Sequence, residues 1–186
     1  IKKQPSLLVG HTARIGNSPF HYSVNGEYGR WKQGEVKSNH KMYNVGLSYD
    51  PIRFDGWKLN LSTSYEVTHE SYNDAHYSGF NYDATLTKDF DDRWSGYGAY
   101  RYQKNHRELS PFNFDNDDYS RKFETGFSYR IDENNRVAFG SKYDVDNATW
   151  RKFDYYWFHD MHCSQVILHY EGRDKTWKVK WRFLPI

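Results

Sequence analysis

The stretch WKLNLSTSYEV, residues 57–67, indicates the fold class, because apolar and polar residues alternate along its whole length. The odd-numbered positions hold Trp, Leu, Leu, Thr, Tyr and Val, whereas the even-numbered positions hold Lys, Asn, Ser, Ser and Glu. A period of two places these sets on opposite faces of a β-strand. The same alternation recurs at 80–87, 122–129 and 177–183. We therefore expect many strands, each with one apolar and one polar face.

The composition is more typical of strands with one aromatic-rich face than of an ordinary soluble protein with an aliphatic core. Aromatic residues make up 19% of the chain, half of the 37% that is hydrophobic, and the mean hydropathy is −1.02. Disorder is disfavoured, because disordered chains are poor in aromatic residues. The 26 basic and 24 acidic residues are spread along the whole length, so no basic block favours nucleic-acid binding. The sequence contains no run of 18 apolar residues, which a membrane-spanning helix would need. A barrel strand needs only about 9–11 residues of alternating polarity.

The alternation and the turn residues predict an all-β fold in one domain covering residues 1–186. We expect an antiparallel transmembrane β-barrel with about 10–11 strands. No stretch shows the period of a helix. The expected strands lie at roughly 5–14, 20–31, 40–50, 56–68, 76–88, 93–104, 119–131, 136–145, 150–159, 163–171 and 176–184.

The lengths of the connections predict the outer membrane as the location. Residues 16–19, 50–56, 89–93 and 132–135 form short connections, whereas 32–39, 68–75 and 105–118 form longer polar ones. Short turns on one rim and long loops on the other are typical of outer-membrane barrels. An odd strand count is unusual there, so we expect the chain to be the C-terminal part of a larger barrel. A soluble β-barrel or sandwich is the alternative, since alternation alone does not say which face is inside.

A short motif near the end resembles a known family. The aromatic run Tyr156-Trp157-Phe158 leads into Asp160, Met161, His162 and Cys163, followed by two more strands. This resembles the C-terminal end of the LptD (OstA, LPS-assembly) outer-membrane protein family. The resemblance implies lipopolysaccharide transport, with the rest of the barrel or a periplasmic domain and a plug lipoprotein as partners.

The resemblance also implies roles for individual residues. Cys163, the single cysteine, would form a disulfide with a segment outside this chain. The terminal strand would lie at a lateral seam between the first and last strands, with Trp177, Val179, Trp181 and Phe183 on its apolar face.

The remaining candidate residues have a plain structural interpretation beside a functional one. Lys178, Lys180 and Arg182 are candidates for contacts with lipid phosphates, although inward charges in barrels usually pair with one another. His159, His162 and Cys163 cluster in sequence, but a zinc site needs four ligands and we expect no metal here. Tyr97, Tyr100 and Tyr102 could bind sugars, but we expect them in an aromatic girdle.

A barrel hydrolase would need acid–base groups that converge at the loop ends. The candidates are His69, Glu70, Asp74 and His76, and also His106, Glu108, Asp117 and Asp118. No nucleophile motif accompanies them. The sequence therefore favours a non-enzymatic protein with no cofactor, taking part in lipopolysaccharide transport and assembly. A passive porin-type channel is the alternative, and an outer-membrane hydrolase is the second alternative.

Overall fold

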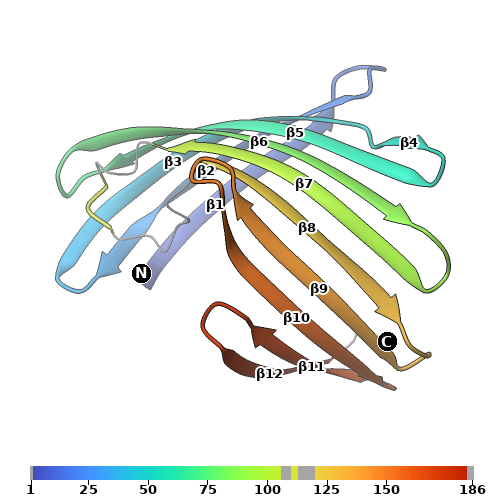
Figure 1. Ribbon diagram of the computed structural model, residues 1–186. Coiled ribbons are helices and arrows are strands. Elements are labelled where there is room, and N and C mark those ends of the chain that lie inside the picture. The colour runs from blue at the N-terminus through green and yellow to red at the C-terminus, as the bar shows by residue number, and fades with distance from the viewer. Residues whose placement is uncertain (1, 106–109, 113–119, 184–186) are drawn as a thin grey trace. The chain divides into compact units, whose positions relative to one another are not determined.

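The computed structural model describes residues 2–105, 110–112 and 120–183, and the fold in these ranges is all-β (Figure 1). The strands are antiparallel and belong to one 12-stranded sheet. Their bounds are β1 Lys2–Arg14, β2 Phe20–Gln33, β3 Val36–Tyr49, β4 Ile52–Phe54, β5 Trp57–Glu70, β6 Ala75–Asp89, β7 Trp94–Asn105, β8 Arg121–Arg130, β9 Asn135–Asp144, β10 Thr149–Met161, β11 Ser164–Glu171 and β12 Thr176–Phe183. The predicted fold class, all-β and antiparallel, is confirmed. Among these residues, no helix is long and apolar enough to cross a membrane.

Each of the eleven predicted strands corresponds to an observed strand, and the twelfth, β4, is a short strand that was not predicted. The hydrogen-bonded order is β1-β2-β3-β5-β6-β7-β8-β9-β10-β11-β12, and β4 pairs only with β5 off this path. Consecutive long strands are therefore neighbours throughout. This meander needs no crossover connection, which agrees with the short turns between most strands.

β4 continues the line of β3 along β5 after an interruption at Asp50-Pro51. Ser48 faces Ser62, whereas Ile52 faces Leu59, so the β3–β4 side holds one more residue than the β5 side. Pro51 has no N–H to donate to a ladder, and this accounts for the break in pairing. β4 then turns into β5 through Asp55 and Gly56, both with positive φ, as a two-residue hairpin turn requires.

Several connections are shorter than the sequence predicted. β2 and β3 extend to a two-residue turn at Gly34-Glu35, in which Gly34 has a φ of 58°, so the predicted loop over 32–39 is wrong. Residues 71–74 alone join β5 to β6, and two residues, 162–163, join β10 to β11. The predicted contrast between short and long connections therefore depends on the connection between β7 and β8, of which only residues 110–112 and 120 are described.

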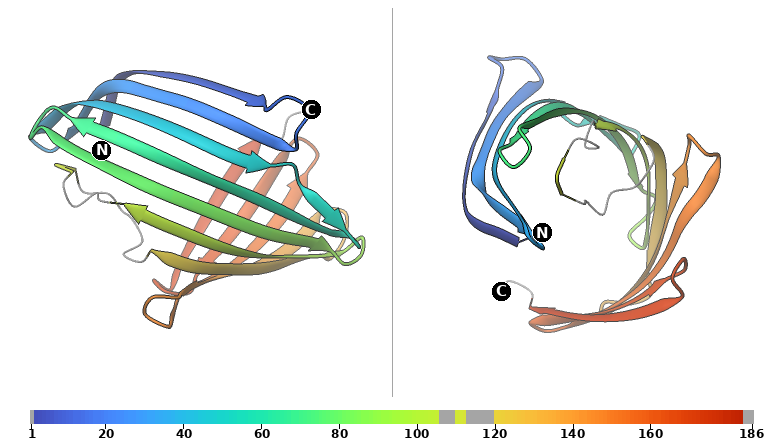
Figure 2. Two further views of the ribbon diagram at one scale, coloured as in Figure 1. Left: turned by 90° about the horizontal axis from the view of Figure 1, so that it is seen from above. Right: turned by 90° about the vertical axis from the view of Figure 1, so that its left-hand side faces the viewer.

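The chain divides into two compact units. The first unit comprises residues 1–51, 60–83 and 102–120, and the second comprises 52–59, 84–101 and 121–186. Within the first unit, β1, β2 and β3 run side by side in both views of Figure 2; within the second, β8 to β12 do the same. The prediction of a single domain over residues 1–186 stays a prediction.

Burial is inverted relative to a soluble protein in each unit. In the second unit, Phe127 is 51% exposed and Trp181 64% exposed, while Asp144 is fully buried. In the first unit, Tyr43 is 66% exposed, while Glu70 is fully buried. Trp57, Leu59 and Leu61 are half-buried and form no dry centre. We call the side that carries these apolar residues the apolar face and the opposite side the polar face. The period-two alternation of the sequence explains both.

Candidate functional site

Glu124 on β8 is a nearly buried carboxylate of the polar face in the second unit. Arg101 Nη1 on β7 donates a hydrogen bond to Glu124 Oε2 at 2.6 Å. Lys142 Nζ on β9, which faces Glu124 in the strand register, lies 3.4 Å from Oε1. The Glu124 side chain is only 7% exposed, whereas Arg101 is 41% exposed. One nearly buried carboxylate thus holds cations from both neighbouring strands.

A second set of charges continues across β10, β11 and β12. His169 Nε2 lies 2.7 Å and Lys152 Nζ 3.4 Å from the carboxylate of Asp154. Lys152 also lies 3.0 Å from Glu171, which contacts Lys178 on β12. These contacts form one continuous chain of ion pairs and hydrogen bonds through Lys178, Glu171, Lys152, Asp154 and His169. Such pairing lets charged side chains occupy a half-buried face.

Basic side chains outnumber carboxylates at the polar-face positions of β7–β12, as the strand registers define them. Lys180 and Arg182 on β12 have no ion-pair partner among the described residues, whereas Lys178 is paired with Glu171. The basic residues are Arg101, Lys122, Arg130, Arg136, Lys142, Lys152, Lys178, Lys180 and Arg182; the carboxylates are Glu124, Asp144, Asp154, Asp160 and Glu171. The polar face of the second unit therefore carries a net positive charge at these positions. The proposed phosphate contacts of Lys178, Lys180 and Arg182 stay a prediction.

Tyr97 lies on the polar face and not in a girdle. A Cβ placed on Gly126 would lie 2.6 Å from the Tyr97 ring, and one on Gly140 would lie 3.8 Å from the Tyr97 hydroxyl. Gly126 and Gly140 are register partners on β8 and β9. The two glycines therefore leave space for the Tyr97 ring against the sheet. The girdle prediction for Tyr97 is wrong, because its odd position on β7 places it opposite Tyr100 and Tyr102.

The polar face of the first unit contains a buried cluster around Glu70. His40 Nδ1 lies 2.6 Å from Glu70 Oε1, and the Tyr77 hydroxyl donates to the same oxygen at 3.2 Å. The His40 ring stacks on Trp31 with centroids 3.6 Å apart. Phe112, from the connection between β7 and β8, packs against Trp31 at 5.8 Å and is buried. This contact places the described piece of that connection on the polar face of the first unit.

The apolar face of the second unit carries a row of aromatic rings that crosses six strands. The centroid distances are 6.3 Å for Trp94 and Phe127, 5.4 Å for Phe127 and Phe139, and 5.1 Å for Phe139 and Tyr155. Tyr155 and Tyr170 follow at 6.1 Å, and Tyr170 and Trp177 at 4.8 Å. Ring pairs at these distances attract one another. The row forms a continuous aromatic band on the exposed side.

The motif at the end of β10 makes hydrogen bonds to the neighbouring strands β9 and β11. Asp160 accepts a hydrogen bond from Gln165 at 2.5 Å, and His159 Nδ1 lies 3.0 Å from Asn135 Oδ1. Cys163 is an exposed free thiol in the two-residue turn. Its disulfide to a segment outside this chain stays a prediction. Trp177, Val179, Trp181 and Phe183 lie on β12, the last strand in the sheet order, and all four are exposed.

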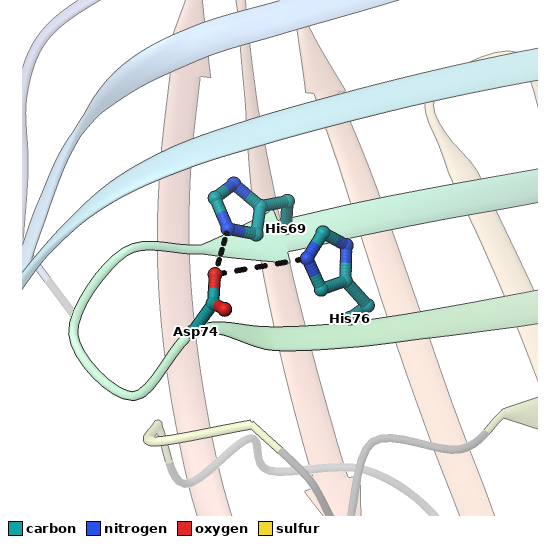
Figure 3. A group of neighbouring side chains, drawn as sticks. All are labelled: His69, Asp74 and His76. Atoms are coloured by element: carbon teal, nitrogen blue, oxygen red, sulfur yellow. Dashed lines mark hydrogen bonds and ion pairs between the residues drawn. The ribbon is translucent and has the colours of Figure 1, made fainter.

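The structure describes four of the loop-end residues considered for a hydrolase and brings three of them together. His69, Asp74 and His76 come together at the β5–β6 turn (Figure 3). Glu70 lies on the polar face, away from them, in the cluster with His40. His106, Glu108, Asp117 and Asp118 lie outside the described residues. The expectation of no metal site stays a prediction; the approach of His69, Asp74 and His76 follows from their spacing across a hairpin turn.

Comparison with known proteins identifies no family. No protein-family model and no curated protein sequence matches the chain. Among solved structures, the chain is similar to "KdgM porin in complex with disordered oligogalacturonate", with a TM-score of 0.48 and 13% identity over 96% of this chain and 87% of that one. This neighbour is a porin. The resemblance to the LptD family is wrong, because no family model matches the chain, and so is the lipopolysaccharide-transport function inferred from it. The short DMHC motif of Asp160–Cys163 is too small to define a family.

Proposed function

We propose that this chain forms the wall of a passive, porin-type channel in the bacterial outer membrane. The inverted burial carries this proposal: many large apolar side chains are exposed, whereas the largest fully buried side chains are Glu70, Thr68 and Asp144. Soluble proteins rarely expose apolar patches larger than a few hundred Å². Outer-membrane barrels, in contrast, turn alternating apolar side chains to lipid and polar ones to a water-filled lumen.

The dimensions and the aromatic band support the same function. Nine of the long strands have 10 to 15 residues, which meets the about 9–11 that a tilted transmembrane strand needs, whereas β11 and β12 have eight. Aromatic rings collect where a barrel wall meets the membrane–water interface. In this proposal, Trp94 at the start of β7 belongs to the girdle at one interface, and Trp177 at the start of β12 belongs to the girdle at the opposite one.

The polar face supports passage of solutes without chemistry. Its charges are held in pairs such as Arg101–Glu124 and Lys152–Glu171, which fixes them along the wall. The surplus of basic side chains on β7–β12 predicts that anions concentrate along these strands, because a surface of one sign raises the local concentration of the opposite ion. We therefore propose a non-enzymatic channel with modest anion selectivity.

Single-channel recording tests this proposal. The chain, refolded in detergent and added to a planar lipid bilayer, should produce stepwise conductance, and a KCl gradient should give a reversal potential that indicates anions as the preferred ions. Heat-denatured protein and detergent alone are the controls. Absence of conductance from protein that is folded and inserted in the bilayer would contradict the proposal.

A further inference from the structure

A cluster of three metal-ligating side chains lies at the turn between β5 and β6, apart from the polar face. His69 is near the end of β5, Asp74 is the last residue of the turn, and His76 is near the start of β6 (Figure 3). His69 Nε2 lies 3.0 Å and His76 Nε2 lies 3.7 Å from the same oxygen, Asp74 Oδ1. All three ligand atoms lie within 4.8 Å of one another.

These distances suit a small transition-metal ion. Zinc binds imidazole nitrogens and carboxylate oxygens at about 2.0–2.2 Å in a tetrahedral arrangement, which places neighbouring ligand atoms about 3.3–3.5 Å apart. The two distances from Asp74 bracket this value. Two imidazoles and one carboxylate favour Zn²⁺, Cu²⁺ or Ni²⁺ over Mg²⁺ or Ca²⁺, which prefer oxygen ligands.

The local fold holds these side chains in position. The His69 and His76 rings stack with centroids 4.3 Å apart and planes inclined by 24°. Asp74 has a φ of 52°, a conformation in which Asp and Asn are favoured among residues that carry a Cβ. This backbone conformation brings Asp74 back towards both imidazoles. The donors are therefore arranged before any ion binds.

The surroundings leave room for an ion and for water. The Asp74 side chain is 87% exposed, and His76 is also exposed, so the open side of the cluster can supply a water ligand. Lys41 faces His69 in the register of β3 and β5. Its ammonium lies 6.0 Å from the centre of the Tyr28 ring on β2, so its charge is directed towards the strand on the other side of β3.

We propose that His69, Asp74 and His76 form a binding site for one divalent transition-metal ion of the zinc class, with water completing the coordination. The ion replaces the hydrogen bond between His69 and Asp74 and joins β5, the turn and β6 through three bonds. This site does not depend on the proposed channel function, because none of its three residues lies on the polar face. A chain that conducts no ions could still bind zinc here.

Calorimetric titration with Zn²⁺ tests the site in the full-length folded chain, in a Cys163→Ser background that removes the single thiol. The parent protein should bind one Zn²⁺ per chain, and H69A, D74N and H76A should each weaken binding at least tenfold, since even outer-shell partners of metal ligands contribute about 10–100-fold. D74N keeps a residue type that accepts the left-handed conformation. A melting temperature that rises with Zn²⁺ in the parent, but not in the variants, would give a second readout.

The matched control is H21A. His21 Nε2 also contacts an aspartate, Asp50, at 2.7 Å, but that aspartate is held by Arg14 instead of a second histidine. H21A should leave zinc affinity unchanged, as should H162A, which removes an exposed histidine beside Cys163. The proposal is overturned if the folded parent binds no Zn²⁺ at millimolar concentration. It is also overturned if H21A or H162A abolishes binding while the three cluster variants retain it. If an alanine variant does not fold, H69Q and H76Q replace it.

Discussion

Arg101 and Glu124 form a hydrogen-bonded ion pair of 2.6 Å between Nη1 and Oε2, joining β7 to β8 on the polar face. The same carboxylate lies 3.4 Å from Lys142 on β9, so it balances two cations on neighbouring strands. Paired charges of this kind add little net field along the wall. Removing the shared anion should therefore change the electrostatics of the proposed channel more than removing a charge in a turn.

Glu124→Gln is expected to increase anion selectivity. The substitution leaves Arg101 and Lys142 without the carboxylate that they share, so the polar face gains one net positive charge at nearly constant side-chain size. The reversal potential in a KCl gradient should move further in the direction that indicates anions. Glu133→Gln is the matched control, because Glu133 is an exposed residue in the β8–β9 turn. Equal shifts in both variants would contradict a wall position for Glu124.

Gly126→Ala should destabilise the fold by about 1–3 kcal/mol, the usual cost of overpacking. The new Cβ would meet the Phe139 carbonyl oxygen at 2.5 Å and the Tyr97 ring at 2.6 Å, and the backbone oxygen cannot move without disturbing the β8–β9 ladder. The facing residue provides the comparison, because a Cβ on Gly140 would meet nothing nearer than 3.8 Å. Urea unfolding in lipid vesicles should show the loss for Gly126→Ala and little change for Gly140→Ala. Similar stabilities would be evidence against the close approach of Tyr97.

The hydrogen bonds of Asp132 predict that the free energy of unfolding falls at acid pH. Its carboxylate accepts hydrogen bonds from the Asn135 side chain at 2.9 Å and from the backbone N–H groups of Asn134 and Asn135 at 2.8 Å. The Asn135 side-chain bond, followed by these N–H groups, lowers the pKa of Asp132 below its ordinary value of 3.8. A lowered pKa in the folded state means that stabilisation is complete above the unfolded pKa and is lost as the pH falls through the folded value.

The test is the free energy of unfolding measured from pH 6 down to pH 2. Wild type should lose stability below about pH 4, and Asp132→Asn should lose less over the same window because its side chain does not titrate. Identical slopes for the two proteins would show that the turn does not respond to the charge of Asp132.

The sequence predicted the strands well because alternation is a local property. Residues 57–67 and 122–129 show which residues share a face, and the structure places them in β5 and β8 accordingly. β4 was missed because a strand of three residues, Ile52–Phe54, is too short to show a period. The loop predicted at 32–39 failed for another reason: its polar residues sit in paired strand ends, where the two-residue turn at Gly34-Glu35 suffices.

The candidate sites were harder to predict because they depend on contacts between strands. Nothing in the sequence pairs Arg101 with Glu124 or Lys152 with Glu171, since register decides both. The burial of Glu70 beside His40 likewise follows from the pairing of β3 with β5. The family resemblance based on Asp160–Cys163 was wrong, because four residues at the end of a strand and in its turn do not carry the identity of a chain.

Solvent and lipid accessibility along β8 shows whether the apolar face is turned to lipid and the polar face to water. Single cysteines at Phe123, Thr125, Phe127 and Tyr129, and at Lys122, Glu124 and Ser128, would be introduced in a Cys163→Ser background. Each is then spin-labelled in protein inserted into lipid vesicles. We expect high accessibility to oxygen in lipid at the first set and to a water-soluble nickel reagent at the second, alternating residue by residue. The opposite alternation, or uniform exposure of both sets to water, would contradict an apolar face turned to lipid and a polar face turned to water.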